Sequence, residues 1–139
     1  MLQQLTLQDA QALVTQALAQ AAADFRRPVC VAVCDAQGFL LAFGRADAAP
    51  VRSIEISQGK AYSAARMGVT TEAFLERLQR ERIEIGFFCD DRLTALPGGA
   101  VLKSAGGRIL GGIGISGLTS AEDQVIANDL TASVASLVP

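Results

Sequence analysis

The chain has 139 residues, of which 50% are hydrophobic and 19% are charged, and its formal net charge is -2. This length and composition predict a single folded domain over residues 1–139 and exclude a disordered chain. The low charge and scattered basic residues argue against nucleic acid as a partner, because phosphate binding needs a concentrated basic surface. The sequence has no histidine, so the commonest general base and metal ligand is missing.

No apolar run reaches the roughly 18 residues that span a bilayer, and the first residues lack the pattern of a signal peptide. We therefore expect no membrane partner and a cytoplasmic location. Cys30, Cys34 and Cys89 show no metal-binding spacing, so no metal site is expected. Cys30 and Cys34 lie in an apolar run and are interpreted as core residues.

The first third of the chain predicts a helix followed by a β-hairpin. Apolar residues recur at steps of three and four over residues 7–24, after Thr6 as a possible cap. Residues 29–34 form an apolar, β-branched run typical of a buried strand. Turn residues at 35–38 then lead into a second strand at 39–43.

The middle of the chain predicts two helices and a short strand. Ser53 is interpreted as the cap of a helix that runs to about Met67. Thr70 or Thr71 caps the next helix, which ends near Arg82 and has charges on its outer face. Residues 83–88 are predicted to form a short strand.

The last third predicts a second hairpin and a final helix. Strands at residues 100–103 and 108–116 are joined by a Gly-rich turn. Residues 120–123 repeat a capping pattern before a helix whose inner stripe is Ile126, Leu130, Val134, Leu137 and Val138. Helix, hairpin, two helices, hairpin and helix together indicate an antiparallel sheet covered by helices, of the α+β class.

The stretch from Gly106 to Gly117 contains the literal G-x-G-x-x-G pattern at Gly112, Gly114 and Gly117. A dinucleotide site would need a further strand and an acidic residue beyond the following helix, and the chain ends at Pro139. We interpret the stretch as a buried Gly-rich strand, where missing side chains let another backbone or a ligand come close.

A succession of motifs resembles the GlcG/HbpS family, which includes the C-terminal domain of PduO. The motifs are Val31-Ala32-Val33-Cys34-Asp35-x-x-Gly38, Arg45-x-Asp47-Ala48, Ser53, Lys60-Ala61, Leu96-Pro97-Gly98-Gly99, Gly112-x-Gly114-x-Ser116-Gly117 and Asp123. The resemblance implies a profilin-like, three-layer α/β/α fold whose five-stranded antiparallel sheet is flanked by helices. It also implies homo-oligomers: dimers that assemble into tetramers or octamers.

Several members of this family are described as haem-binding or haem-degrading, and the PduO domain is linked to haem and corrinoid chemistry. The resemblance makes haem and a corrinoid the candidate cofactors without deciding whether either binds, and the lack of histidine excludes histidine-ligated haem. Tyr62, Met67, Met1 or a cysteine could ligate iron in principle.

The polar and glycine positions of these motifs are the candidate ligand-binding residues: Arg45, Asp47, Ser53, Lys60, Gly98, Gly99 and Ser116. Lys60 is also the candidate catalytic residue, because a desolvated lysine has a lowered pKa suited to acid–base or Schiff-base chemistry. A structural ion pair of Lys60 with Asp35 or Asp47 is the competing interpretation. Ser53 and Asp123 are alternatively interpreted as helix caps.

Three functions follow from these residues. The first is a small-ligand-binding protein for a tetrapyrrole or a small anionic metabolite. Its pocket would lie where residues 96–99 and the Gly-rich strand approach the helix of Lys60, at a possible subunit interface. The second is an accessory or assembly subunit of a catabolic pathway. The third is a Lys60-dependent enzyme for a small carbonyl or carboxylate compound; the lack of histidine weighs against it.

Overall fold

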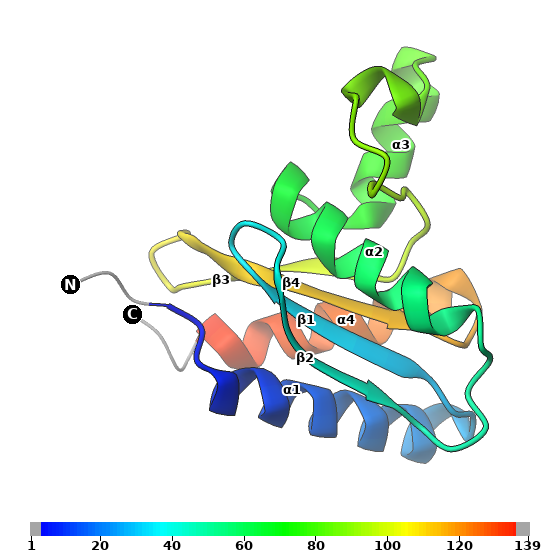
Figure 1. Ribbon diagram of the computed structural model, residues 1–139, viewed down its shortest axis with the longest axis vertical. Coiled ribbons are helices and arrows are strands. Elements are labelled where there is room, and N and C mark those ends of the chain that lie inside the picture. The colour runs from blue at the N-terminus through cyan, green and yellow to red at the C-terminus, as the bar shows by residue number, and fades with distance from the viewer. Residues whose placement is uncertain (1–3, 136–139) are drawn as a thin grey trace.

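A computed structural model describes residues 4–135 and places helices on both faces of an antiparallel sheet (Figure 1). Within these residues no helix is long and apolar enough to cross a membrane. The elements in chain order are α1 (Leu7–Gln20), the π-helical turn η1 (Ala21–Phe25), β1 (Cys30–Asp35), β2 (Leu40–Arg45), α2 (Ser53–Met67), α3 (Thr71–Glu81), the 3-10 turn η2 (Ile85–Phe88), β3 (Gly99–Lys103), β4 (Ile109–Ser116) and α4 (Ser120–Ala135).

The sheet has four strands in the order β2-β1-β4-β3, and every neighbouring pair is antiparallel. Both predicted hairpins are confirmed, and they meet where β1 pairs with β4. The α+β class is therefore confirmed. The two central strands are β1 from the first hairpin and β4 from the second.

The predicted fifth strand is wrong. Residues 83–88 form no strand, and Ile85–Phe88 is the 3-10 turn η2. This segment packs beside α3, far from both edges of the sheet, at the top of Figure 1. A strand needs a neighbouring edge to satisfy its backbone groups, and none is within reach here. Phe87 stays 65% exposed, whereas Phe88 packs edge-on against Phe74 of α3.

The two faces of the sheet carry side chains of different size. Val31, Val33, Ile113 and Ile115 are buried in one core with residues of α1 and α4. Ala32 and Cys34, which alternate with the valines, form a small second cluster with Ala61 and Ala65 of α2. Side chains alternate across a strand, so the large residues of β1 and β4 face α1 and α4, and the small residues face α2. The helix α2 therefore packs closer to the sheet than α1 and α4 do.

Gly112 and Gly114 bring α2 into direct contact with β4. A Cβ atom added at Gly114 would lie 2.0 Å from the carbonyl oxygen of Ser57, and one at Gly112 would lie 2.2 Å from that of Ala61. No side chain fits in this space, which agrees with the interpretation of the Gly-rich stretch as a strand approached by another backbone. The close approach places the side chains of α2 over the end of β4.

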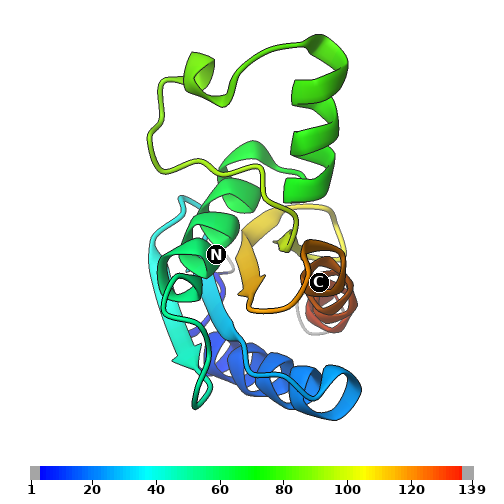
Figure 2. The ribbon, with the colours of Figure 1, turned by 90° about the vertical axis from the view of Figure 1, so that its right-hand side faces the viewer.

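Residues 71–98 form an arm that extends beyond α2, away from the sheet (Figure 2). Two hydrogen bonds fasten its returning loop to α2. The Tyr62 hydroxyl donates to Asp90 over 2.6 Å, and the backbone N–H of Thr94 donates to the Ser63 hydroxyl over 2.8 Å. The loop is thus held at a fixed place along α2, although it has no regular secondary structure.

The N-terminus of α4 is capped one residue earlier than predicted. Thr119 accepts from the backbone N–H of Glu122, and Glu122 accepts from that of Thr119, which is a capping box. The pattern at residues 120–123 is therefore not the cap. Ile126, Leu130 and Val134 are buried as predicted, while the predicted inner residues Leu137 and Val138 lie outside the described residues.

Candidate functional site

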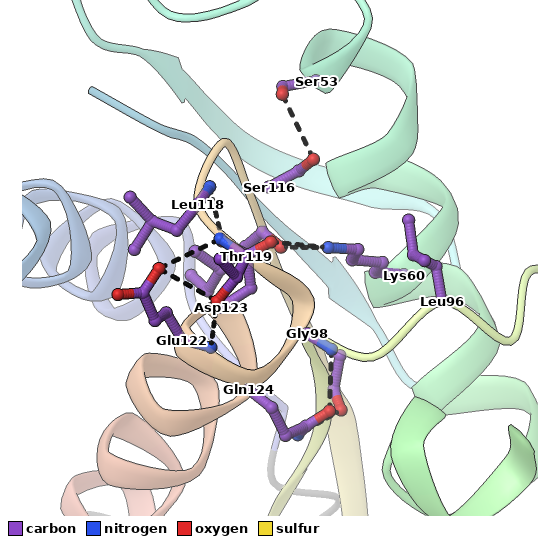
Figure 3. A network of polar contacts seen from close by, with 12 residues as sticks. Ser53, Lys60, Leu96, Gly98, Ser116, Leu118, Thr119, Glu122, Asp123 and Gln124 are labelled. Carbon is purple, nitrogen blue, oxygen red and sulfur yellow. Dashed lines mark hydrogen bonds and ion pairs between the residues drawn. The ribbon is translucent and has the colours of Figure 1, made fainter. Parts of the chain in front are cut away.

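The side chain of Lys60 crosses from α2 to the first turn of α4 and is fully buried (Figure 3). Its Nζ donates to the carbonyl oxygen of Ile115 over 2.7 Å and to Oδ2 of Asp123 over 3.1 Å. One amine therefore joins three elements, α2, the end of β4 and α4. The predicted ion-pair partners, Asp35 and Asp47, are wrong.

Asp123 is held by both of its carboxylate oxygens. Oδ2 pairs with Lys60, and Oδ1 accepts from the backbone N–H of Leu118 over 3.1 Å. Asp123 is only 2% exposed. It is the counterion of a buried lysine rather than a cap for the helix N-terminus, so its interpretation as a cap residue is wrong.

Burial and charge act in opposite directions on this pair. Burial lowers the pKa of Lys60 from its ordinary 10.5, and the Asp123 carboxylate opposes the shift. Burial likewise raises the pKa of Asp123 from its ordinary 3.8, and the Lys60 ammonium opposes that shift. Each charge is stable in the interior mainly because the other is present.

Gly98 and Gly99 complete the cluster through their backbone. The N–H of Gly98 donates to Oε1 of Gln124 over 2.7 Å, and the N–H of Gly99 donates to the hydroxyl of Thr71 over 2.8 Å. Gly98 has φ +129°, and a Cβ there would lie 2.6 Å from Nζ of Lys60. Only glycine therefore allows the chain to pass over the buried amine.

Ser53 and Ser116 lie together at the far end of the same α2–β4 seam. Their hydroxyls are 3.2 Å apart and both residues are buried. Arg52, not Ser53, is the residue before the helix, and no side chain caps that end. Ser53 thus bonds across to the sheet, and its interpretation as a cap is wrong.

Arg45 and Asp47 lie outside the Lys60 cluster. Arg45 pairs with Cys30 in the sheet, and Cys30 pairs with Ser116, so Arg45 is two strands or about 10 Å from Ser116. Its guanidinium donates to the carbonyl oxygen of Ala49 and closes the loop after β2. Asp47 is exposed in that loop.

The fold therefore brings five of the predicted site residues together along the α2–β4 seam: Lys60, Gly98, Gly99, Ser53 and Ser116. Sequence reasoning missed three residues that hold this seam: Asp123 as an ion-pair partner, Gln124 and Thr71. A signal for Asp123 was present, because it precedes Ile126 by three residues and so belongs to the buried stripe of α4. Gln124 and Thr71 had no such signal.

A separate hollow of about 370 Å³ lies between α2 and the returning loop of the arm. It is lined by Glu55, Gln58, Gly59, Asp91 and Arg92. Unlike the Lys60 cluster, it is open to solvent and carries exposed charges of both signs. Within residues 4–135 no group of three or more histidine, cysteine or acidic residues could hold a metal ion.

Comparison with known proteins shows the family to which the chain belongs. A family model described as haem degrading protein HbpS-like matches residues 5–132. The chain belongs to the HbpS-like family. The match covers both hairpins, the helices α1, α2 and α3, and α4 as far as residue 132, and so includes every residue of the Lys60 cluster.

Solved structures related to HbpS superpose on nearly the whole chain. ORFY of Klebsiella pneumoniae is 26% identical, with a TM-score of 0.84 over 100% of this chain and 95% of that one. An HbpS double mutant of Streptomyces reticuli is 27% identical, with a TM-score of 0.83 over 96% and 89%. A complex of PduOC with haem is 26% identical, with a TM-score of 0.78 over 90% and 91%.

Among curated sequences, the chain is 29% identical to an uncharacterised 15.0 kDa protein from the dhaT-dhaS intergenic region of Citrobacter freundii. The similarity extends over 115 residues, which are 82% of this chain and 81% of that protein. The HbpS-like chain thus has relatives of similar size that match over most of their length.

Proposed function

We propose that this HbpS-like chain is a small-ligand-binding protein for a tetrapyrrole or a small anionic metabolite. The observation that carries the proposal is the similarity to the PduOC–haem complex, which extends over 90% of this chain. The Lys60 cluster is buried, and its amine already donates to Ile115 and Asp123, so the cluster offers no space for a ligand.

A tetrapyrrole iron would need a ligand other than histidine in this chain. Cys30 and Cys34 are buried, and burial raises the pKa of Cys34 to about 12. The hydrogen bond to Asp90 raises the pKa of Tyr62. Thiolate and phenolate forms at these positions are therefore disfavoured at neutral pH. Cys89 is exposed, so of the three cysteines it is the one that the iron of a bound haem could reach.

Titration with haemin and with cobalamin, followed by absorbance and by the melting temperature, tests the proposal. We expect a saturable Soret shift with haemin and a higher melting temperature, because a ligand that binds the folded state stabilises it by mass action. Cys89→Ser should remove the Soret shift, while Met67→Leu should retain it. If haemin, cobalamin and a panel of small carboxylates all leave the melting temperature unchanged, the proposed function is wrong.

The contacts of Lys60 favour a structural role over catalysis. A lysine that forms a Schiff base or transfers a proton must reach its substrate, whereas Lys60 is 0% exposed and its amine already donates to Ile115 and Asp123. We therefore keep binding, rather than a Lys60-dependent reaction, as the proposed function.

We also propose that the protein works as a homo-oligomer, which is a dimer, a tetramer or an octamer. Large apolar side chains are exposed on the described surface, among them Val51 at 72%, Phe87 at 65% and Phe39 at 60%. Contact between copies would remove such surface from water. Light scattering at micromolar concentration should give a mass of at least twice 14.5 kDa; a monomer would contradict the proposal.

A further inference from the structure

The hollow between α2 and the arm has walls that are fixed relative to each other. Glu55, Gln58 and Gly59 lie at helical spacings of three and four, so they share one face of α2. Asp91 and Arg92 come from the returning loop, which is fastened to the same helix by hydrogen bonds on either side of these two residues. The backbones of the two walls are therefore held together without a ligand.

Arg92 is held in place by an aromatic ring, and Asp90 is the nearby carboxylate that acts on it. Its guanidinium carbon lies 4.2 Å from the centre of the Tyr62 ring, at a distance typical of a cation–π contact. The Tyr62 hydroxyl is in turn fixed by Asp90. Within the described residues, the guanidinium forms no ion pair or hydrogen bond, and the same is true of the carboxylates of Glu55 and Asp91.

Gly59 provides space at the floor of the hollow. A Cβ added there would be 3.4 Å from the methyl group of Thr94 and 3.7 Å from the carbonyl oxygen of Arg92. The volume of about 370 Å³ falls in the range of small-molecule sites. It matches a compact metabolite better than a macrocycle.

We propose that this hollow binds a zwitterionic metabolite of the amino-acid class, with its carboxylate on Arg92 and its ammonium between Glu55 and Asp91. The planar guanidinium can accept a carboxylate in bidentate geometry. An anion alone would meet two carboxylates, and a cation alone would meet the guanidinium, so only a ligand with both charges matches all three groups. This inference goes beyond the proposed function, because its ligand carries both charges and is neither a tetrapyrrole nor a simple anion.

The test compares β-alanine and L-alanine with two matched probes that each lack one charge, propionate and propylamine. Calorimetry and melting temperature should show binding of at least one of the two amino acids and at least tenfold weaker binding of both single-charge probes. Arg92→Gln and Glu55→Gln should each weaken amino-acid binding at least tenfold. Arg80→Gln, on the exposed face of α3, should leave it unchanged.

The possible results separate the two proposals. Equal binding of propionate and β-alanine, or unchanged affinity in both hollow variants, would overturn the zwitterion site. If haemin raises the melting temperature and no amino acid does, the zwitterion site is wrong and the proposed function stands. If neither class of ligand binds, both are wrong.

Discussion

Gly114→Ala is expected to destabilise the protein severely. The added methyl group would lie 2.0 Å from the Ser57 carbonyl oxygen and 2.7 Å from the Ala61 backbone nitrogen. Both are backbone atoms of α2, so no side-chain rotation can relieve the overlap, and the helix must move off the sheet. Such overpacking typically costs about 1–3 kcal/mol in free energy of unfolding and occasionally more, and a clash with helix backbone should lie at the upper end of that range. This loss is a large fraction of the roughly 5–15 kcal/mol that stabilises a domain.

Chemical denaturation or thermal melting by circular dichroism would measure this loss, with Gly86→Ala as the matched control. An added Cβ at Gly86 meets no atom within 4 Å, so this variant should be neutral or slightly more stable. If Gly114→Ala and Gly86→Ala had similar stability, the direct packing of α2 on β4 would be contradicted.

The hairpins and the packing role of the glycines could be predicted because they depend on local pattern. β-Branched runs bounded by turn residues specify strands, and a Gly-rich strand implies a close backbone neighbour. The alternation of small and large residues in β1 and β4 also predicts which face of the sheet each helix covers. Ala32 and Cys34 on one face, with Val31 and Val33 on the other, already indicate which face the narrow helix α2 covers.

The strand predicted at residues 83–88 shows the limit of local pattern. Ile83, Ile85 and the phenylalanines are apolar enough for a strand, but a strand also requires a free neighbouring edge, which only the tertiary fold supplies. The arm instead places Phe87 on the surface. Phe87 is among the exposed apolar side chains that the proposed contact between copies would cover.

Proximity along the chain did not identify the partner of Lys60, because the pair spans 63 positions. Asp35 and Asp47 were nearer along the chain, yet Asp35 accepts from the backbone N–H groups of its own turn at Gln37 and Phe39. The helical stripe that contains Asp123 was the better guide, since a carboxylate on a buried face needs a buried counterion.

Lys60→Met is expected to destabilise the protein by about 3–5 kcal/mol at neutral pH, because it leaves the Asp123 carboxylate buried without its counterion. Burial is the largest influence on Asp123 and raises its pKa, and loss of Lys60 removes the main opposing charge. The folded variant then holds a proton that the unfolded chain releases above the ordinary value of 3.8. Its stability should therefore fall as pH rises from about 4 towards neutral.

Asp123→Asn should show the opposite dependence on pH. The Asn side-chain oxygen can still accept from Leu118, but Lys60 loses its counterion and its pKa, already lowered by burial, falls further. The unfolded chain then binds the proton more tightly than the folded one, so stability should rise as pH increases towards 10.5.

Chemical denaturation of both single variants and of the double variant Lys60→Met/Asp123→Asn between pH 4 and 9 separates a structural ion pair from a catalytic lysine. If the pair is structural, the stability of Lys60→Met falls with rising pH and that of Asp123→Asn increases. The stability of the double variant then depends less on pH. Its loss of stability is also smaller than the sum of the losses in the two single variants, because neither charge is left buried alone. Strictly additive losses, or equal slopes in the single variants, would show that Lys60 and Asp123 are not coupled and would reopen a functional role for the amine.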